Sequence, residues 1–216
     1  MIVYFVRHAS AGQRKLSPKK DEKRALDAEG MHQCTQMGRI LSAMQVSVDA
    51  VISSPLKRAT QTASFIANEI GHEGKLNLEH ALRPEAKYDH FRDMLRKYSK
   101  FEALMVVGHN PNLSEFLGRM VVSNGDRAYI ELKKAAVAKL ESEQKKSVLQ
   151  WLLTPRLATA SAESSIAEGS NISKFSHNGI GPSEGLAAEY RKGKKKKLRQ
   201  AQADLTTRSR PKMSRK

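Results

Sequence analysis

The sequence predicts an α/β fold, a three-layer sandwich in which a mostly parallel central sheet is flanked by helices. Short apolar runs rich in β-branched and aromatic residues are typical of strands buried in a parallel sheet. They alternate along the chain with stretches whose apolar residues recur at helical spacing. The 216 residues are 39% hydrophobic and include one cysteine, so the core of an ordinary domain must be stable without an internal disulfide.

The expected elements follow one another in a regular order. Strands are expected at residues 1–6, 49–52 and 103–107. Helices are expected where apolar side chains share one face, at residues 31–44, 59–70, 91–98 and 113–120. Strand and helix in alternation indicate a doubly wound sandwich. Further strands at residues 128–140 and 148–153 are expected to finish the sheet, and Pro155 to close the domain.

The composition changes near residue 160. We expect a folded domain over residues 1–160 and a basic, largely disordered tail over residues 161–216, which has few apolar side chains to bury. Each part carries half of the net charge of +16, although the tail is much shorter. The basic run at residues 191–199 predicts weak electrostatic association with nucleic acid or polyphosphate. Only Tyr190 lies near it, so we expect no reading of base sequence.

Several protein classes are disfavoured. No apolar stretch is long enough for a membrane span and no signal peptide is indicated, so we expect a cytoplasmic protein. The cysteine and histidines lack zinc-site spacing. Neither a Gly-x-x-x-x-Gly-Lys phosphate loop nor a dinucleotide-binding fingerprint is present, which argues against a nucleotide-driven kinase.

Basic side chains follow the three strands predicted to be parallel. Arg7 and His8 follow the first, Arg58 lies shortly after the second, and His109 follows the third. Ligands of such sheets bind outside the carboxyl ends of the strands, so we expect these four residues to converge. Asn110 suits the N-cap of the next helix, which would add free backbone N–H groups to the same crevice. The sequence therefore predicts an anion site.

The residue types favour phosphoryl chemistry. Arginine offers a permanent charge and a planar fork that fits phosphate. An imidazole among guanidiniums would have a lowered pKa, which leaves a lone pair free to attack phosphorus. A second imidazole, if protonated, could share the charge that builds on the equatorial oxygens.

Three motifs resemble the histidine phosphatase superfamily and its phosphoglycerate-mutase-like fold. They are RHASAG at residues 7–12, SSPLKRATQTA at 53–63 and VVGHNPNLSEFL at 106–117. Three further features are similar to the SixA-type phosphohistidine phosphatases of that superfamily. They are the short length of the domain, the stretch DEKRALDAEG at residues 21–30 and the end of the domain after residue 157.

The resemblance covers about residues 1–157 and implies roles for individual residues. His8 would be the nucleophile that becomes a transient phosphohistidine, while Arg7, Arg58 and His109 hold the phosphoryl group, with no metal or other cofactor. Further expected substrate contacts are Arg24, Ser10 and Asn110.

The sequence departs from the family pattern at two places. Ala9 follows His8 where the family usually has glycine. Larger members place an acid between the second Arg and the second His to protonate a leaving alkoxide, and here Glu85 is the candidate, with Asp89 as the alternative. A weak acid would suit a phosphoramidate, whose imidazole leaving group needs less help than an alcohol.

We therefore expect a phosphatase that hydrolyses phosphohistidine on a partner protein through a covalent phosphohistidine enzyme intermediate. One alternative is a phosphatase of small phosphomonoesters that uses Glu85 or Asp89 as its acid. The other is a non-catalytic protein that binds polyanions through the pocket and the basic tail.

Overall fold

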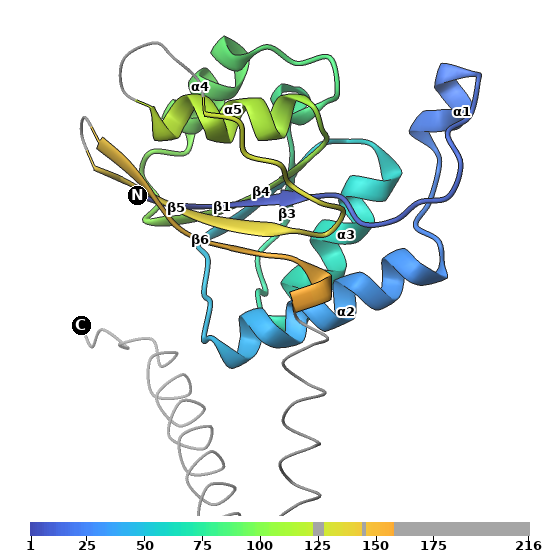
Figure 1. The fold of residues 1–216 in the computed structure, drawn as a ribbon, viewed down its shortest axis with the longest axis horizontal. Helices are drawn as coiled ribbons and strands as arrows, with labels where there is room; N and C mark the ends of the chain where they lie inside the picture. The colour runs from blue at the N-terminus through green and yellow to red at the C-terminus, as the bar shows by residue number, and fades with distance from the viewer. Residues whose placement is uncertain (123–127, 144–145, 158–216) are drawn as a thin grey trace, which may run out of the picture. The chain divides into compact units, whose positions relative to one another are not determined.

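A computed structural model describes residues 1–122, 128–143 and 146–157, which form one sheet with helices on both faces (Figure 1). Helices α4 (Tyr88–Lys97) and α5 (Asn112–Val121) cover one face, and α2 (Ala28–Ala43) and α3 (Lys57–Glu69) cover the other. The predicted three-layer sandwich is confirmed. The predicted domain boundary near residue 160 and the predicted basic tail lie outside the described residues.

The sheet has six strands in the order β3-β2-β4-β1-β5-β6. Their bounds are β1 Ile2–Arg7, β2 Ala50–Ser53, β3 Leu76–Leu78, β4 Ala103–Gly108, β5 Val137–Glu143 and β6 Lys146–Leu153. The first four are parallel, whereas β5 runs antiparallel to β1 and β6 antiparallel to β5. Arg7 pairs with Gly108 and Ser53 with Val107, so the carboxyl ends of β1, β2 and β4 meet at one edge.

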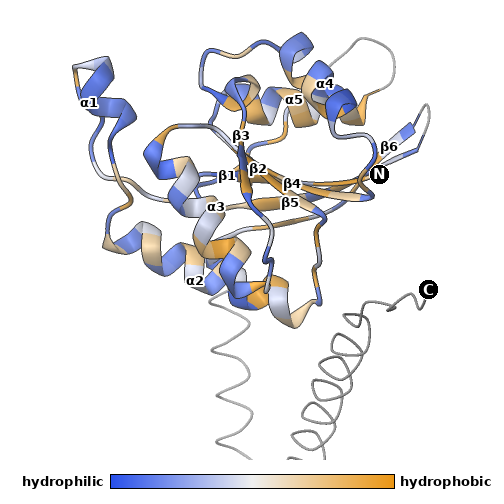
Figure 2. Ribbon diagram, turned by 180° about the vertical axis from the view of Figure 1, so that it is seen from behind, coloured by the Kyte–Doolittle hydropathy of each residue, from blue (hydrophilic) through white to orange (hydrophobic). Residues whose placement is uncertain are grey.

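Two apolar cores lie on opposite faces of the sheet, because successive strand residues point to opposite sides. Val3 and Phe5 pack in the core under α4 and α5, and Tyr4 and Val6 pack in the core over α2 and α3. The central strands are therefore apolar at nearly every position, as the hydropathy colouring shows (Figure 2).

The predicted strand over residues 128–140 is wrong in its first part, because β5 begins only at Val137. The backbone turns at Ala135, which has a φ of 55° and donates its N–H to the carbonyl oxygen of Arg7. Upstream, the carbonyl oxygen of Leu132 accepts hydrogen bonds from the side chains of Arg7 and Asn110. This segment is thus held by side chains at the edge of the sheet and, at Ala135 and Ala136, by backbone hydrogen bonds to Arg7.

The loop after β1 is fixed to the start of α2 by Asp27. Its carboxylate caps α2 by accepting from the Gly30 N–H at 2.8 Å, and it also accepts from Ser10 Oγ at 2.9 Å and the Gly12 N–H at 2.6 Å. A Cβ at Gly30 would lie 2.0 Å from the carbonyl oxygen of Ser10, so only glycine fits there. This contact determines how closely α2 approaches the residues that follow β1.

Three short elements were not predicted from the sequence: strand β3, helix α1 (Pro18–Glu22) and the 3-10 helix η1 (His80–Leu82). Among the helices of the described residues, none has the length and apolar character needed to cross a membrane.

Candidate active site

His8 lies directly after β1, and its backbone is hydrogen-bonded to β4. Its N–H donates to the carbonyl oxygen of Gly108 at 3.0 Å. Its Nδ1 lies 2.8 Å from the carbonyl oxygen of Ala9, an atom that can only accept, so Nδ1 carries the proton. In the neutral ring the lone pair is therefore on Nε2, the nitrogen available for attack.

The surroundings of His8 favour this neutral form. The pKa of His8 is lowered to about 3, chiefly by burial, with the positive charges of Arg58, Arg7 and Arg24 acting in the same direction and the hydrogen bond to Ala9 opposing them. The sequence predicted a lowered pKa from the neighbouring guanidiniums alone. In the folded protein, burial is the larger cause.

His109 lies beside His8, with the two ring centroids 4.9 Å apart. Its Nε2 is 2.9 Å from Ser54 Oγ, and its Nδ1 is buried without a hydrogen-bond partner among the described residues. Burial, followed by the charges of His8, Arg58 and other arginines, lowers the pKa of His109 to about 2. The free site therefore holds a neutral second imidazole, which contributes hydrogen bonding rather than the charge considered from the sequence.

Arg58, in the first turn of α3, supplies a buried positive charge. It is 4% exposed, and its Nη1 donates to the backbone carbonyl of Asp21 at 3.0 Å and lies 3.3 Å from that residue's carboxylate. Its Nε is buried without a hydrogen-bond partner among the described residues. A buried guanidinium nitrogen left unpaired in this way is a candidate donor to a bound anion.

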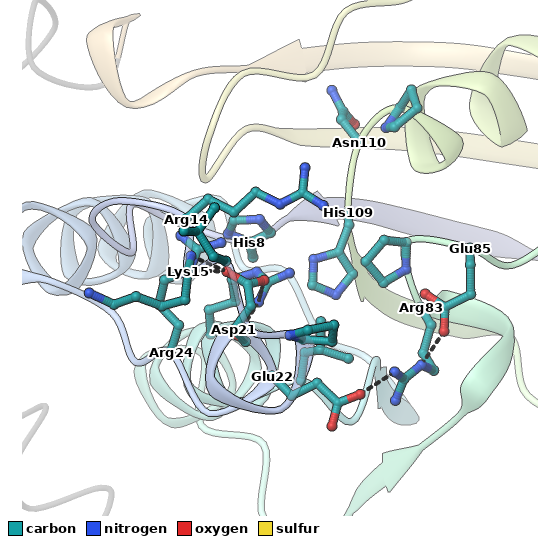
Figure 3. A pocket seen from close by; sticks show the side chains of 16 residues that line it. His8, Arg14, Lys15, Asp21, Glu22, Arg24, Arg83, Glu85, His109 and Asn110 are labelled. Atoms are coloured by element: carbon teal, nitrogen blue, oxygen red, sulfur yellow. Dashed lines mark hydrogen bonds and ion pairs between the residues drawn. The ribbon is translucent and has the colours of Figure 1, made fainter.

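A pocket of about 750 Å³ brings most of the predicted site residues together (Figure 3). The predicted residues among its lining are His8, Arg24, Arg58, Glu85, His109 and Asn110. They come from the loops after β1 and β4, the start of α3 and the segment after η1. The pocket therefore opens at the carboxyl edge of the parallel strands, as the sequence predicted.

Arg7 and Ser10 do not line this pocket. Arg7 lines the adjoining one, which shares Asn110 and Pro111, and its Nη1 donates to the carbonyl oxygen of Leu132 at 2.8 Å. Ser10 is buried, donating to Asp27 and accepting from Lys134 Nζ at 3.3 Å. In this arrangement Arg7 acts on His8 through its charge, and Ser10 supports the loop.

Asn110 lines the pocket but does not cap α5, so the predicted N-cap is wrong. Pro111 occupies the N-cap position. The Asn110 side chain is used elsewhere, because its Nδ2 donates to the carbonyl oxygen of Leu132 at 2.9 Å and its Oδ1 accepts from Ser114 Oγ at 3.0 Å.

The two candidate acids differ in position. Glu85 lines the pocket and accepts a hydrogen bond from Arg83 Nε. Burial raises the pKa of Glu85, but the hydrogen bond and charge of Arg83 outweigh it and hold the pKa below its usual value. Asp89 is exposed, pairs with Arg92 at 3.1 Å and is not part of the lining. The carboxyl group of Glu85 is therefore ionised at neutral pH.

Sequence reasoning missed a second group of lining residues. Arg14, Lys15, Asp21 and Glu22 come from the segment between β1 and α2. Arg83 reaches across the mouth of the pocket, pairing with both Glu22 and Glu85 (Figure 3). Recognising β3 would have pointed to Arg83, which follows soon after its carboxyl end. In the described part of the chain, no three His, Cys, Asp or Glu side chains are placed to hold a metal ion.

Residues 3–98 match the family model of the histidine phosphatase superfamily (branch 1). The chain resembles this superfamily. The match covers the first two of the three motifs, confirms the resemblance drawn from them and supports a phosphatase. An uncharacterized protein of Picosynechococcus sp. is 28% identical over 145 residues, which cover 66% of this chain and 86% of that protein.

Solved structures of histidine phosphatases share the fold. The protein histidine phosphatase SixA, solved with tungstate, has a TM-score of 0.64 and 20% identity, covering 72% of this chain and 97% of that one. A putative α-ribazole-5′-P phosphatase from Escherichia coli has a TM-score of 0.57 and 15% identity, covering 72% and 97%. At these identities the likeness establishes the architecture, and the substrate must be argued from the site.

Proposed function

We propose that this chain is a phosphohistidine phosphatase that acts on a partner protein. The observation that carries the proposal is the state of His8, whose Nδ1 donates to Ala9 and whose Nε2 is unprotonated beside the buried guanidinium of Arg58. A neutral imidazole at the floor of a cationic pocket suits attack on phosphorus.

The proposed reaction has two displacement steps. The Nε2 lone pair of His8 attacks phosphorus, an Nε2–P bond forms, and the N–P bond of the substrate breaks. Water then attacks the phosphorus of phosphorylated His8 and gives inorganic phosphate and the free imidazole. Arg58 and, where its Nδ1 carries the proton, neutral His109 would donate to the phosphoryl oxygens through both steps.

The state of Glu85 favours a phosphoramidate over an alkyl phosphate. A leaving alkoxide needs a proton from an acid, and Arg83 keeps the Glu85 carboxyl ionised. A phosphohistidine whose other ring nitrogen is protonated releases a neutral imidazole, so the breaking N–P bond needs no acid. This pocket therefore supports cleavage of an N–P bond better than cleavage of an alkyl ester.

The test compares the wild type with His8→Ala and with a matched control, His32→Ala, on a protein carrying radiolabelled phosphohistidine. His32 is an exposed histidine on α2, outside the pocket. We expect phosphate release by the wild type and His32→Ala and no release by His8→Ala. An acid-labile, alkali-stable label should be trapped on the wild type and His32→Ala but not on His8→Ala. Release by His8→Ala at the wild-type rate would refute the role of His8.

The second candidate, a phosphatase of small phosphomonoesters, is favoured by the size of the pocket and by the position of Glu85 in its wall. It predicts hydrolysis of an alkyl phosphate and its loss in Glu85→Gln. This candidate would be contradicted if the wild type hydrolysed phosphohistidine but not the ester, and if Glu85→Gln kept the wild-type activity on phosphohistidine. Tight phosphate binding without turnover of either compound would favour the polyanion-binding alternative.

A further inference from the structure

The segment at residues 14–23, which we call the basic arm, borders the pocket and carries α1 away from the sheet (Figure 1). It contains five exposed cations and two acids. The cations are Arg14, Lys15, Lys19, Lys20 and Lys23.

The two acids of the basic arm are already neutralised by arginines of the pocket. Asp21 pairs with Arg24 at 2.9 Å and with Arg58 at 3.3 Å, and Glu22 pairs with Arg83. None of the five exposed cations forms an ion pair with a described residue. On α4, by contrast, Arg92 and Arg96 each pair with an acid one turn away. The basic arm therefore presents uncompensated positive charge beside the pocket.

These ion pairs also anchor the basic arm. Asp21 connects it to Arg58 at the start of α3, and Glu22 connects it to Arg83 just after η1. The Lys15 N–H donates to the Asp21 carboxylate at 3.0 Å. An anchored surface loses less conformational entropy when a partner binds. Leu16 lines the pocket mouth with its side chain fully exposed, so a partner that covers the arm would also bury an apolar group.

We propose that the basic arm docks an acidic protein surface surrounding the phosphohistidine of the substrate. This inference rests on the proposed function. Lys19, Lys20 and Lys23 do not line the pocket, so a small phosphorylated molecule bound there would not contact them. A folded protein whose phosphorylated side chain enters the pocket would cover them, and acidic residues on its surface complement their charge.

The test uses two synthetic peptides, each with one phosphohistidine, flanked by glutamates in one and by serines in the other. The arm variant combines Lys19→Glu, Lys20→Glu and Lys23→Glu. The control variant, with the same change in net charge, combines Lys75→Glu, Lys100→Glu and Lys146→Glu. The control positions are exposed and precede β3, precede β4 and begin β6, so they lie at the opposite edge of the sheet.

The measured quantity is the ratio of kcat/KM for the glutamate peptide to that for the serine peptide. We expect a wild-type ratio of about ten that falls as salt rises, the same ratio in the control variant, and a ratio of one or less in the arm variant. Equal kcat/KM for both peptides in the wild type would overturn the docking proposal alone. An unchanged ratio in the arm variant would do the same.

Two further outcomes separate this inference from its rivals. Hydrolysis of neither peptide by the wild type would refute the proposed function itself. If the arm variant loses affinity for a single-stranded oligonucleotide but keeps the wild-type peptide ratio, the arm binds nucleic acid and the docking proposal is overturned.

Discussion

Lowering the pH from 8 to 5 is expected to destabilise the protein through His8 and His109. Their pKa values are about 3 and about 2 in the folded protein, against about 6.5 for an unperturbed histidine. As the pH falls below 6.5, the unfolded chain binds protons that the folded chain does not, so stability that is full above pH 6.5 is progressively lost.

The size of the loss follows from the distance below the unfolded pKa. At pH 5 the unfolded histidine lies about 1.5 pH units below its pKa, which corresponds to about 2 kcal/mol for each histidine and about 4 kcal/mol for the pair. Since both folded-state values lie well below 5, a shift of one unit in either would hardly change this result.

The assay is urea unfolding at pH 8 and pH 5 for the wild type, His8→Asn and the exposed-site control His32→Asn. The drop in the free energy of unfolding between the two pH values should be about 2 kcal/mol smaller in His8→Asn than in the wild type, and unchanged in the control. An equal drop in His8→Asn and wild type would refute the argument that folding keeps the imidazole of His8 neutral.

Three further predictions concern the pocket and its support. Asp21→Asn removes a negative charge from Arg24 and Arg58 and should strengthen inhibition by inorganic phosphate by about fivefold, whereas weaker inhibition would contradict this role. Gly30→Ala places a Cβ against the Ser10 carbonyl oxygen and should lower the free energy of unfolding in urea by about 1–3 kcal/mol. Wild-type stability would show that the backbone at Ser10 moves aside without cost. Asp27→Ala should lower the free energy of unfolding in urea by about 1–3 kcal/mol, because the α2 cap and the bonds to Ser10 and Gly12 are lost together. A smaller loss would show that water replaces the carboxylate in those hydrogen bonds.

The architecture could be predicted because the central strands are buried on both faces and are therefore apolar at almost every position. Strand β3 gave no such signal. It is three residues long at the edge of the sheet, and Asn77 interrupts its two leucines. Missing β3 also hid Arg83, because the rule that ligands bind beyond strand ends could not be applied to a strand that had not been recognised.

The grouping of His8, Arg58 and His109 in one pocket could be predicted for the same reason, since each follows a parallel strand. The position of Arg7 could not. It ends β1, and neighbouring residues of a strand point to opposite sides, so Arg7 and the following His8 line different pockets. The basic arm has no apolar periodicity, so the sequence offered no signal that it borders the site.

The backbone N–H and C=O of Leu132 join parts of the chain that are far apart in sequence. Its carbonyl oxygen accepts from Arg7 and Asn110, and its N–H donates to Ser114 Oγ at 3.1 Å. All three contacts are made by backbone atoms of residue 132, which every amino acid except proline would supply equally. The number of residues between Leu132 and β5 is therefore what this segment must preserve. Another apolar side chain that fits the core at residue 132 would leave the junction intact, because Leu132 is fully buried. Inserting or deleting one residue between β5 and Leu132 would instead move these backbone groups away from all three partners.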